Sequence, residues 1–426
     1  MKQDQALALM QQGHNIFLTG MAGTGKSYLL NTFIAWCEEH SKYVSITAST
    51  GIAATHIGGV TIHSWGGLGI YSQNDLTDAA LNEICRNPYT QTAIRETAVL
   101  IIDEISMLHA YQLDGLDYIC STIRKDPRPF GGIQIILSGD FLQIPPVSTN
   151  NNVTYAFDST IWDKANLITC YLEDIFRQDD LEFIQILNQV RYGDVRTESF
   201  NTLAACINKQ LDIEDPTELY PRNKEVEYIN TQKLNKIDKP EVVYKMTVRG
   251  REALVNSLKR SCISPEILVL KEGAHVIFTK NNFKAGFSNG TFGTVIKCEE
   301  GRHPIVKLTS NKEIEVEKAV WEIKKFNFTK QTYEIEAAVS QIPLKLAYAL
   351  TAHKSQGTTL EYAKINLANL FSYNMGYVAL SRVKSLKNLT LVALDHSLYL
   401  VDPVLLNKDK EFKAADKTNL EIKYEL

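Results

Sequence analysis

Features that mark several classes of protein are scarce in this chain of 426 residues. No run of eighteen apolar residues occurs, which excludes an ordinary membrane-spanning helix. The first residues, MKQDQALALMQQG, place charge and glutamine where a signal peptide needs an apolar stretch. Lysine and arginine total 45 against 49 aspartate and glutamate, so the net charge of −4 gives no hint of a nucleic-acid partner. We expect a cytoplasmic protein, of the bacterial or phage type, in which any nucleic-acid binding depends on local patches.

Cysteine is also sparse. The seven cysteines lie far apart and form no C-x-x-C pair: Cys37, Cys85, Cys120, Cys170, Cys206, Cys262 and Cys298. An odd, scattered set predicts reduced thiols and argues against a disulfide framework or a zinc site. Hydrophobic residues make up 44% of the chain and charged residues 22%, as in globular proteins with sizeable cores. The length predicts two or three domains, at roughly 150 residues each.

Short apolar segments recur in the first part of the chain. They are NIFLT (15–19), YVSIT (43–47), AVLII (98–102) and IQIIL (133–137), and residues 27–39 between the first two have a helical pattern. Strands that alternate with helices predict a doubly wound α/β domain with a parallel sheet over residues 1–165. The segment from Gly58 to Tyr71, rich in glycine and aromatic residues, interrupts this pattern and predicts an inserted loop or subdomain, which we place at 58–80.

A second α/β domain is predicted further along. Residues 179–192 have a helical pattern that ends at Gly193, and strand signals return at 347–351, 363–367 and 389–393. Between them, the short β-like runs AHVIFTK, GTVIKC, PIVKL and EIEVEK predict a small inserted β-barrel. Residues 236–325 carry 17 Lys and Arg against 11 Asp and Glu. That excess is typical of a solvated face or of a surface that follows a phosphate backbone, and composition leaves both open.

A phosphate-binding loop is predicted at residues 20–27. GMAGTGKS fits G-x-x-x-x-G-K-[ST], follows an apolar strand and opens a helix. Backbone N–H groups around Gly23, Thr24 and Gly25 can surround phosphate oxygens, helped by the positive end of the helix dipole. Lys26 would reach the β- and γ-phosphates, and the Ser27 hydroxyl would bind Mg²⁺. The pattern therefore indicates a nucleoside triphosphate site.

Two further strand ends carry groups suited to hydrolysis. AVLIIDEISML ends in Asp103 and Glu104, which places two carboxylates at the same sheet edge as the loop. Asp103 would hold the magnesium through water, and Glu104 would act as the base for the attacking water. A later strand ends in SGDFLQIPP, where Gln143 could contact both the γ-phosphate and that water.

Two arginines complete the predicted site. Arg177 lies in IFRQDD and Arg382 in YVALSR, each beside an apolar segment. A guanidinium on the transferred γ-phosphate increases the rate by ~10³–10⁵. If the second α/β domain supplies both across a cleft, hydrolysis depends on closure of that cleft, and the ATP state controls the geometry between the domains.

Together these motifs resemble the Pif-family (petite integration frequency) helicases and their RecD-like relatives, B-group members of superfamily I that move 5′→3′ on single-stranded DNA. The most specific stretches are GDFLQIPPV, AHKSQGTTL and YVALSR, in the family's order. The others include FLTGMAGTGKS (17–27), TIHSWGGLG (61–69), LIIDEIS (100–106), IFRQ (175–178) and FSNGTFGTV (287–295). The resemblance covers almost the whole chain.

The resemblance implies a fold with two RecA-like domains, 1A over 1–165 and 2A over 166–276 and 341–426. It also implies a 1B wedge at 58–80 and an SH3-like 2B β-barrel over 277–340. The implied ATPase residues are Gln3 (with Gln5 as a competitor) for the adenine, then Gly23, Thr24, Gly25, Lys26, Ser27, Asp103, Glu104, Gln143, Arg177, Gln356, Gly357 and Arg382. The implied DNA-contact residues are Thr50, His63, Ser64, Asn289, Thr351, His353 and Lys354.

The sequence departs from the family pattern in two places. LDGLDYICSTIR (113–124) lacks some basic residues of the family's signature helix, and Pro221-Arg222-Asn223 replaces the usual threonine-asparagine pair. The chemistry of strand binding nevertheless agrees with the resemblance, since hydroxyls and amides bind phosphates and aromatic or histidine faces stack on bases. TIHSWGG supplies Thr61, His63, Ser64 and Trp65, although His63 and Trp65 could instead pack the loop against the core.

Two other functions fit part of the pattern. A nucleotide kinase or a protein-remodelling ATPase shares the phosphate loop. A kinase needs an arginine-rich lid, which we do not find in this sequence. A hexameric remodeller takes its arginine from a partner, whereas Arg177 and Arg382 belong to the same chain. A single-strand-binding module whose ATP site only switches affinity has no need of Glu104. We therefore favour a DNA-stimulated ATP hydrolase that unwinds DNA, with ATP and Mg²⁺ as cofactors, single-stranded DNA and its duplex junctions as partners, and a monomer as the working unit. DNA repair and recombination are the roles that the resemblance implies.

Overall fold

Six parallel strands form one sheet in the computed structural model, in the order β3-β2-β4-β5-β1-β6. They are β1 (Ile16–Gly20), β2 (Val44–Ala48), β3 (Val60–Thr61), β4 (Val99–Asp103), β5 (Gln134–Ser138) and β6 (Ile168–Leu172). Strands β1, β4 and β5 are almost wholly buried, as near-continuous apolar runs require when both faces of a sheet are covered. The four strands predicted from these runs are confirmed, each displaced by one residue.

The structure describes residues 1–68, 75–146, 153–213, 215–282, 284–287, 289–308, 310–327, 332–356 and 358–423. The chain divides into two compact units, the first made of residues 1–214 and 352–426 and the second of residues 215–351. In the parts that the structure describes, no helix is long and apolar enough to cross a membrane.

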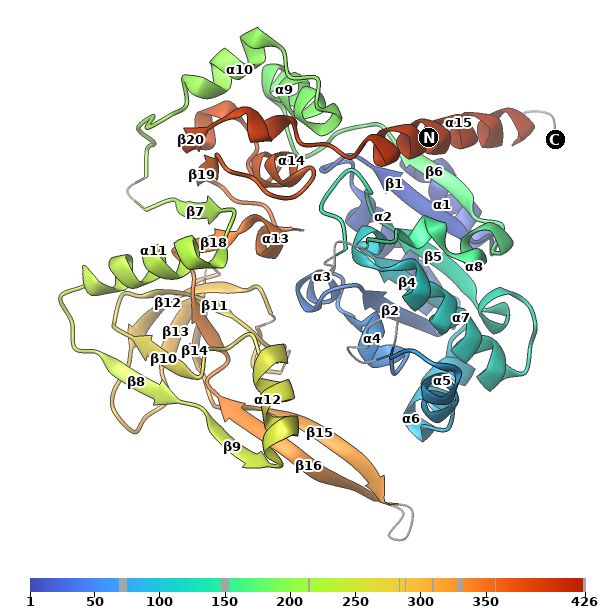
Figure 1. Cartoon of the computed structure of the whole chain (residues 1–426), viewed down its shortest axis with the longest axis horizontal. Helices are drawn as coiled ribbons and strands as arrows, with labels where there is room; N and C mark the ends of the chain where they lie inside the picture. The colour runs from blue at the N-terminus through green and yellow to red at the C-terminus, as the bar shows by residue number, and fades with distance from the viewer. Residues whose placement is uncertain are drawn as a thin grey trace. The chain divides into compact units, whose positions relative to one another are not determined.

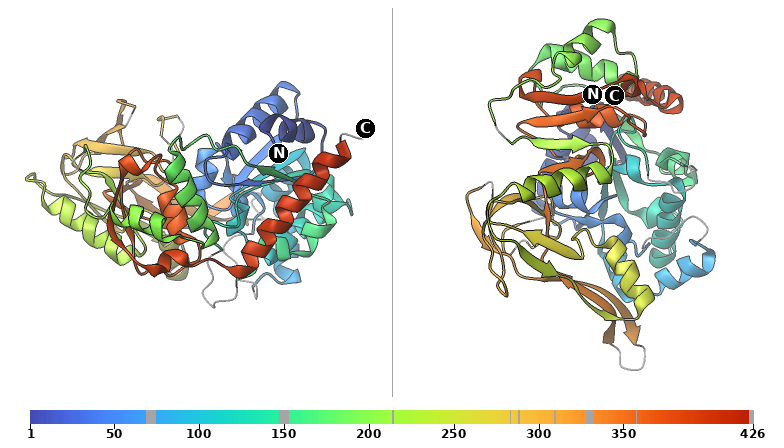
Figure 2. Two further views of the ribbon diagram at one scale, coloured as in Figure 1. Left: turned by 90° about the horizontal axis from the view of Figure 1, so that it is seen from above. Right: turned by 60° about the vertical axis from the view of Figure 1, so that its left-hand side comes forward.

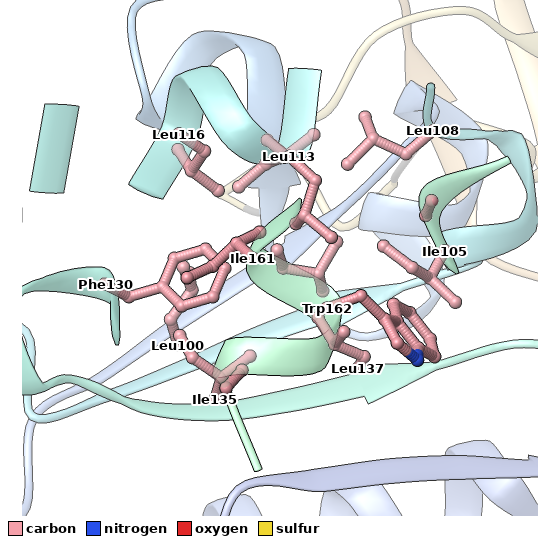
Figure 3. Close-up of a cluster of buried hydrophobic side chains, with 14 of the residues drawn as sticks. Leu100, Ile105, Leu108, Leu113, Leu116, Phe130, Ile135, Leu137, Ile161 and Trp162 are labelled. Atoms are coloured by element: carbon pink, nitrogen blue, oxygen red, sulfur yellow. The ribbon is translucent and has the colours of Figure 1, made fainter. Parts of the chain in front are cut away.

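Helices cover both faces of the first sheet (Figures 1 and 2). On one face, α1 (Gln3–Gln11) and α2 (Lys26–Glu39) bury side chains such as Leu30 and Phe33 against the sheet. On the other, α7 (Ala110–Arg124) and α8 (Thr160–Lys164) pack around Leu100 and Leu137, as Figure 3 shows. The remaining helices before β5 are α3 (Gly51–His56), α4 (Ile62–Trp65), α5 (Asp78–Cys85) and α6 (Pro88–Glu96). This is the doubly wound arrangement that the sequence predicts.

The first sheet continues past residue 165, where we placed the end of the first domain. Strand β6 pairs in parallel with β1, and α15 (Pro403–Lys423) packs against it. The Tyr171 hydroxyl donates to Asp409 Oδ1 at 2.8 Å, and the Tyr171 backbone N–H donates to Asp416 Oδ1 at 3.0 Å. The Phe412 ring lies 4.8 Å from the Phe17 ring. Helix α15 is therefore part of the first unit's core.

The first unit also contains two later strands and their helices. Strands β19 (Ala363–Leu367) and β20 (Leu389–Leu394) pair in parallel, as their apolar runs predict. The helix predicted over 179–192 is α9 (Leu181–Tyr192), which the Asp180 side chain caps and Gly193 ends with φ of 69°. Nearby are α10 (Thr197–Ala204), α13 (Ala352–Ser355) and α14 (Met375–Leu380).

The second unit is larger than the inserted barrel predicted over 277–340. A five-stranded antiparallel sheet has the order β14-β13-β12-β11-β17, and a three-stranded sheet has the order β15-β16-β9. The buried residues of the five-stranded sheet pack with those of β8 and β10 around one core. Ala337 and Val339 of β16 belong to a second cluster, with Val255 and Leu258 of α12. The strands are β7 (Thr217–Tyr220), β8 (Val242–Lys245), β9 (Thr247–Gly250), β10 (Ile267–Leu270), β11 (His275–Phe278), β12 (Phe292–Lys297), β13 (Ile305–Leu308), β14 (Glu313–Glu315), β15 (Ala319–Asn327), β16 (Thr332–Gln341), β17 (Leu344–Leu346) and β18 (Ala349–Thr351), with helices α11 (Asn223–Asn235) and α12 (Glu252–Ser261).

Candidate nucleotide-binding site

The predicted phosphate loop joins the buried strand β1 to the start of α2 at Lys26. Gly23 and Gly25 have φ values of 89° and 82°, a left-handed conformation that side-chain-bearing residues rarely adopt. A Cβ atom on Gly23 would lie 2.8 Å from Arg177 Cβ and from Gln178 Oε1. The loop therefore requires glycine both for its backbone path and for its close contact with residues 177–178.

The Lys26 side chain lies inside this loop. Its Nζ atom donates to the carbonyl oxygens of Gly20 and Met21, at 2.7 and 3.0 Å. Burial lowers the pKa of Lys26, although Asp140 and Glu104 act in the opposite direction. A half-buried ammonium held among carbonyl oxygens is positioned to exchange them for phosphate oxygens.

The loop opens into a cavity of about 270 Å³. Its lining comes from the phosphate loop, from the segments that follow β4 and β5, and from the segments that follow β6 and α14. Eight of the predicted ATPase residues line it: Gly23, Gly25, Lys26, Ser27, Glu104, Gln143, Arg177 and Arg382. The structure thus brings together groups that are up to several hundred residues apart in the chain.

The two carboxylates at the end of β4 differ in environment. Asp103 is 7% exposed at the last position of the strand. Glu104 follows with φ of 53°, a conformation that costs a residue with a side chain about 1–2 kcal/mol. Its carboxylate accepts a hydrogen bond from Gln356 Nε2 at 3.0 Å. Burial and the neighbouring Asp103 raise the pKa of Glu104 to about 7, against the opposite effect of Lys26.

The segment after β5 holds the Gln143 side chain at the cavity. Gln143 is 4% exposed, and its Nε2 atom lies 3.4 Å from Asp140 Oδ2, to which it donates. The backbone N–H of Leu142 donates to the other oxygen of Asp140 at 3.1 Å. One carboxylate therefore fixes the turn that presents the amide.

The two arginines lie close to one another. Arg177 Nη1 donates to the Ser381 carbonyl at 3.2 Å, next to Arg382. Arg382 is 1% exposed and donates to the carbonyls of Val378, Ser355 and Thr358 at 2.8, 3.3 and 3.2 Å. Burial and the nearby Arg177 lower the pKa of Arg382 to about 9. Two guanidinium groups in a desolvated cavity favour an anion placed between them.

Four predicted residues that the structure describes are not part of the cavity lining: Gln3, Thr24, Asp103 and Gln356. Gln3 Nε2 donates to the Thr24 carbonyl at 3.0 Å, whereas Gln5 accepts a hydrogen bond from Lys2 at the start of α1. The Thr24 side chain is buried and donates to the Met21 carbonyl, so it stabilises the loop. Gln356 reaches the site through Glu104, as described above, and Gly357 lies outside the described residues.

Three aromatic residues at this site were not predicted from the sequence. Phe176 and Tyr28 line the cavity and are 65% and 69% exposed, which leaves their faces open to a nucleotide base. Tyr377 is buried, and its hydroxyl accepts a hydrogen bond from the Ala22 N–H of the phosphate loop at 2.9 Å. Each of the three lies close in the sequence to a predicted site residue, namely Arg177, Ser27 or Arg382. That proximity was the one signal from which they could have been predicted.

The expected DNA-contact residues in the segment 50–65 have local roles of their own. Thr50 Oγ1 accepts from the Ala53 N–H at the start of α3, and His63 Nε2 lies 2.9 Å from Gln112 Nε2 of α7. Ser64 is exposed. Trp65 is 8% exposed and donates to Ser45 Oγ at 2.9 Å, so it packs the core. The described part of the 58–80 insertion is ordered as β3, α4 and the start of α5, and residues 69–74 lie outside the described range.

The later DNA-contact residues are divided between the units. His353 and Lys354 lie on α13 of the first unit, half-buried, and burial lowers the pKa of His353. Thr351 ends β18 of the second unit and is 5% exposed. Asn289, also in the second unit, is 8% exposed, and its backbone N–H donates to Asn281 Oδ1 at 2.8 Å. The geometry within each unit therefore does not assemble these residues into one site.

Comparisons with known proteins identify relatives along the whole chain. A family model described as PIF1-like helicase matches residues 3–201, and a model for the 2B domain of DNA helicase Pif1 matches residues 253–298. The ATP-dependent DNA helicase Pif1 of Psychrobacter sp. (strain PRwf-1) is 38% identical, covering 97% of this chain and 71% of its own length. The protein of the same name in Bdellovibrio bacteriovorus is 36% identical, covering 97% of this chain and 92% of its own.

Solved structures are similar over the same extent. The crystal structure of Pif1 helicase from Candida albicans has a TM-score of 0.87 at 34% identity, covering 96% of this chain and 98% of that one. The crystal structure of Bacteroides Pif1 bound to single-stranded DNA has a TM-score of 0.80 at 27% identity, covering 97% and 96%. The same Bacteroides protein has been solved with ADP-AlF₃ and single-stranded DNA together.

Proposed function

The chain belongs to the PIF1-like helicase family, and we propose that it is an ATP-dependent DNA helicase that moves 5′→3′ on single-stranded DNA and separates duplex strands. Its fold is that of the family, with parallel sheets of RecA-like domains and a 2B domain. The relatives are named ATP-dependent DNA helicases, and a Pif1 helicase from Bacteroides is solved with ADP-AlF₃ and single-stranded DNA. We carry both the activity and the substrate over to this chain.

The observation that supports the proposal most strongly is the lining of one cavity by Lys26, Glu104, Gln143, Arg177 and Arg382. A phosphate-binding protein that only holds its ligand has use for the lysine but not for a carboxylate base. A base, a water-orienting amide and two guanidinium groups at one point are the set that phosphoryl transfer to water requires. We therefore assign ATP hydrolysis to this cavity.

Each group has a task that its environment suits. Lys26 binds the β- and γ-phosphates in place of the Gly20 and Met21 carbonyls. Glu104 accepts a proton from the attacking water, and a pKa of about 7 keeps a useful fraction of it ionised at neutral pH. Gln143 orients that water, and the two arginines stabilise the charge that develops on the transferred phosphoryl group.

Ser27 and Asp103 fit a magnesium ion carried by the nucleotide. Hydroxyl and carboxylate oxygens are the ligands Mg²⁺ prefers, and it is usually bound by one or two protein groups plus substrate phosphates. When bound, the ion would neutralise charge on the phosphates, and Ser27 and Asp103 would hold it in place.

Two contacts of Glu104 lead toward the expected DNA-contact segments. Ser49 Oγ donates to the Glu104 carbonyl at 2.8 Å, and Ser49 precedes Thr50. Gln356 Nε2 donates to the Glu104 carboxylate, and Gln356 lies two residues after Lys354. We propose that a strand bound at these two segments shifts the base through these contacts, and that this makes hydrolysis depend on DNA.

We propose single-stranded DNA and its junctions with duplex as the partners, and a monomer as the working unit, because one chain supplies the whole cavity lining. A related structure describes two coordinating Pif1 helicases at forked DNA, so a second copy at a fork is compatible with this unit. Such a helicase acts where duplex DNA must be opened, and we place it in DNA repair and recombination. RNA–DNA hybrids and G-quadruplexes are further structures on which to test it.

Strand displacement tests the proposal. Duplexes with a 5′ or a 3′ single-stranded tail are incubated with the protein, Mg²⁺ and ATP, with Glu104→Gln as a matched control that keeps the shape of the site. We expect displacement of the 5′-tailed duplex alone, and none with the control. Displacement from the 3′ tail would reverse the polarity, and no displacement of either substrate alongside normal ATP hydrolysis would contradict the helicase assignment.

A further inference from the structure

Arg191, in the last turn of α9, is one of two arginines, with Arg382, that are the largest fully buried side chains of the described residues. Its Nη2 atom forms ion pairs with Asp140 Oδ1 at 2.8 Å and with Asp409 Oδ1 at 3.2 Å. Its Nη1 atom donates to the hydroxyls of Tyr171 and Tyr192 at 3.1 and 2.5 Å. Burial alone lowers the pKa of Arg191, but these neighbours outweigh it and the guanidinium stays charged.

The Asp140 partner leads directly to the nucleotide cavity. The same carboxylate accepts hydrogen bonds from the Gln143 amide at 3.4 Å and from the Leu142 N–H at 3.1 Å. Asp140 is 1% exposed, so solvent does not compete for it. Arg191 therefore contacts the residue that holds Gln143, without lining the cavity itself.

Arg191 also contacts the elements that carry the two arginines. Its backbone carbonyl accepts from Asn374 Nδ2 at 3.0 Å, and Asn374 precedes α14, which leads into Arg382. Helix α9, which carries Arg191 in its last turn, begins four residues after Arg177. The Arg191–Asp140 pair thus lies where the Gln143 segment, α9 and α14 meet.

We propose that Arg191 and Asp140 are positioning residues that hold Gln143 in register with Arg177 and Arg382, so that recognition of the γ-phosphate by all three is a single event. The inference rests on the proposed function, because it takes these three residues to contact the γ-phosphate. A buried ion pair contributes little net stability, since desolvation offsets its attraction, but it fixes geometry closely. The Arg191–Asp140 pair therefore acts by fixing the position of Gln143 and not by adding stability.

Asp409 offers a matched control on the other side of Arg191. Its carboxylate accepts from Tyr171, Tyr192 and Arg191, and pairs with Lys413 at 3.3 Å. None of these four partners lines the cavity. Asp409→Asn therefore perturbs the same buried cluster without touching the segment that holds Gln143.

The test compares Asp140→Asn, Arg191→Lys and Asp409→Asn in the full chain. Affinities for ADP and for a nonhydrolysable ATP analogue are measured by competition with a fluorescent nucleotide, together with kcat, KM and thermal melting. We expect Asp140→Asn and Arg191→Lys to weaken the analogue about tenfold and ADP less than about twofold, with kcat falling about tenfold, because misplaced groups lose transition-state contact. Asp409→Asn should lower the melting temperature and leave the ratio of the two affinities unchanged.

The outcomes separate this inference from the proposed function. If the wild type does not prefer the ATP analogue to ADP, the assignment of the cavity fails. If the wild type behaves as expected but Asp140→Asn and Asp409→Asn shift the affinity ratio equally, or neither shifts it, the pair is only structural and the inference is overturned. If Arg191→Lys does not fold, Asp140→Asn, which preserves side-chain shape, carries the test by itself.

Discussion

The nucleotide cavity and the expected DNA-contact residues differ in how far local structure assembles them. Eight predicted ATPase residues from distant segments line one cavity. The expected DNA-contact residues lie in two separate units, and several of their segments already have structural roles. Thr50 accepts a hydrogen bond at the start of α3, Trp65 packs in the core, and the Asn289 backbone is bonded to Asn281. Phosphate chemistry needs several groups at one point, whereas a strand is held along its length by residue types that also have structural uses. The first kind of site can be derived from motifs much more fully than the second.

The largest effect should come from an arginine of the cavity. Arg382→Ala removes a guanidinium from the proposed γ-phosphate site, and we expect kcat to fall by roughly 10³-fold or more. Steady-state ATP hydrolysis with saturating single-stranded DNA measures this. Arg177→Ala is the companion variant, and thermal melting separates the catalytic loss from the loss of the Arg382 hydrogen bonds. Retention of more than a tenth of the wild-type rate by both variants would contradict their role.

Glu104→Gln should be nearly as damaging to turnover but harmless to binding. It removes the proposed base and keeps the hydrogen-bonding shape, so hydrolysis should fall by about 10²–10⁴. Nucleotide affinity, from fluorescence titration, and affinity for single-stranded DNA, from anisotropy, should stay close to wild type. Normal hydrolysis in this variant would end the assignment of Glu104.

Two neighbouring residues, Trp65 and Ser64, test the expected DNA-contact segment. Trp65 is buried and donates to Ser45, so Trp65→Phe should lower the free energy of unfolding by about 1–2 kcal/mol through the lost hydrogen bond and smaller ring. Ser64→Ala, at an exposed position, should leave stability unchanged and weaken binding of single-stranded DNA. Urea unfolding and anisotropy measure the two. The opposite assignment of effects would show that Trp65, rather than Ser64, faces the strand.

The smallest expected effect is on the pH dependence of stability. Because the pKa of Glu104 is raised from 4.5 to about 7 in the folded protein, ionising it costs stability as pH rises through that window. Glu104→Gln removes this cost, so the variant should melt at a higher temperature than the wild type at pH 8. The difference should shrink as pH falls toward 5. An unchanged difference at both pH values would mean that Glu104 is ionised throughout.

Buried parallel strands and the phosphate loop could be predicted because their sequence signals are local. The segments that form β1, β4 and β5 are almost wholly apolar, and a glycine loop between a strand and a helix is compatible with few other structures. Strand β2 carries Ser45 and Thr47, and its place in the alternation of strands and helices made it predictable. Strand β6 (ITCYL) was not predicted as part of the first sheet, because its place there depends on pairing with β1, which is far away in the chain.

The remaining features of the site depend on contacts between distant segments. Arg191 meets Asp409 across 218 residues, and no spacing rule links them. Tyr377 reaches the phosphate loop across 355 residues. The burial of Trp65 follows from a partner, Ser45, whose own position is set by the sheet. Such pairings are fixed only once the chain has packed.

The central claim is that a DNA strand controls hydrolysis in the cavity, and the rate of ATP hydrolysis with and without a single-stranded oligonucleotide tests it most directly. We expect strong stimulation by the strand at low salt and weaker stimulation at high salt, because phosphate contacts release counterions. The variant Glu104→Gln, which lacks the proposed base, gives the background rate of hydrolysis. Hydrolysis at the same rate with and without DNA, at both salt concentrations, would contradict the claim and indicate a different P-loop enzyme.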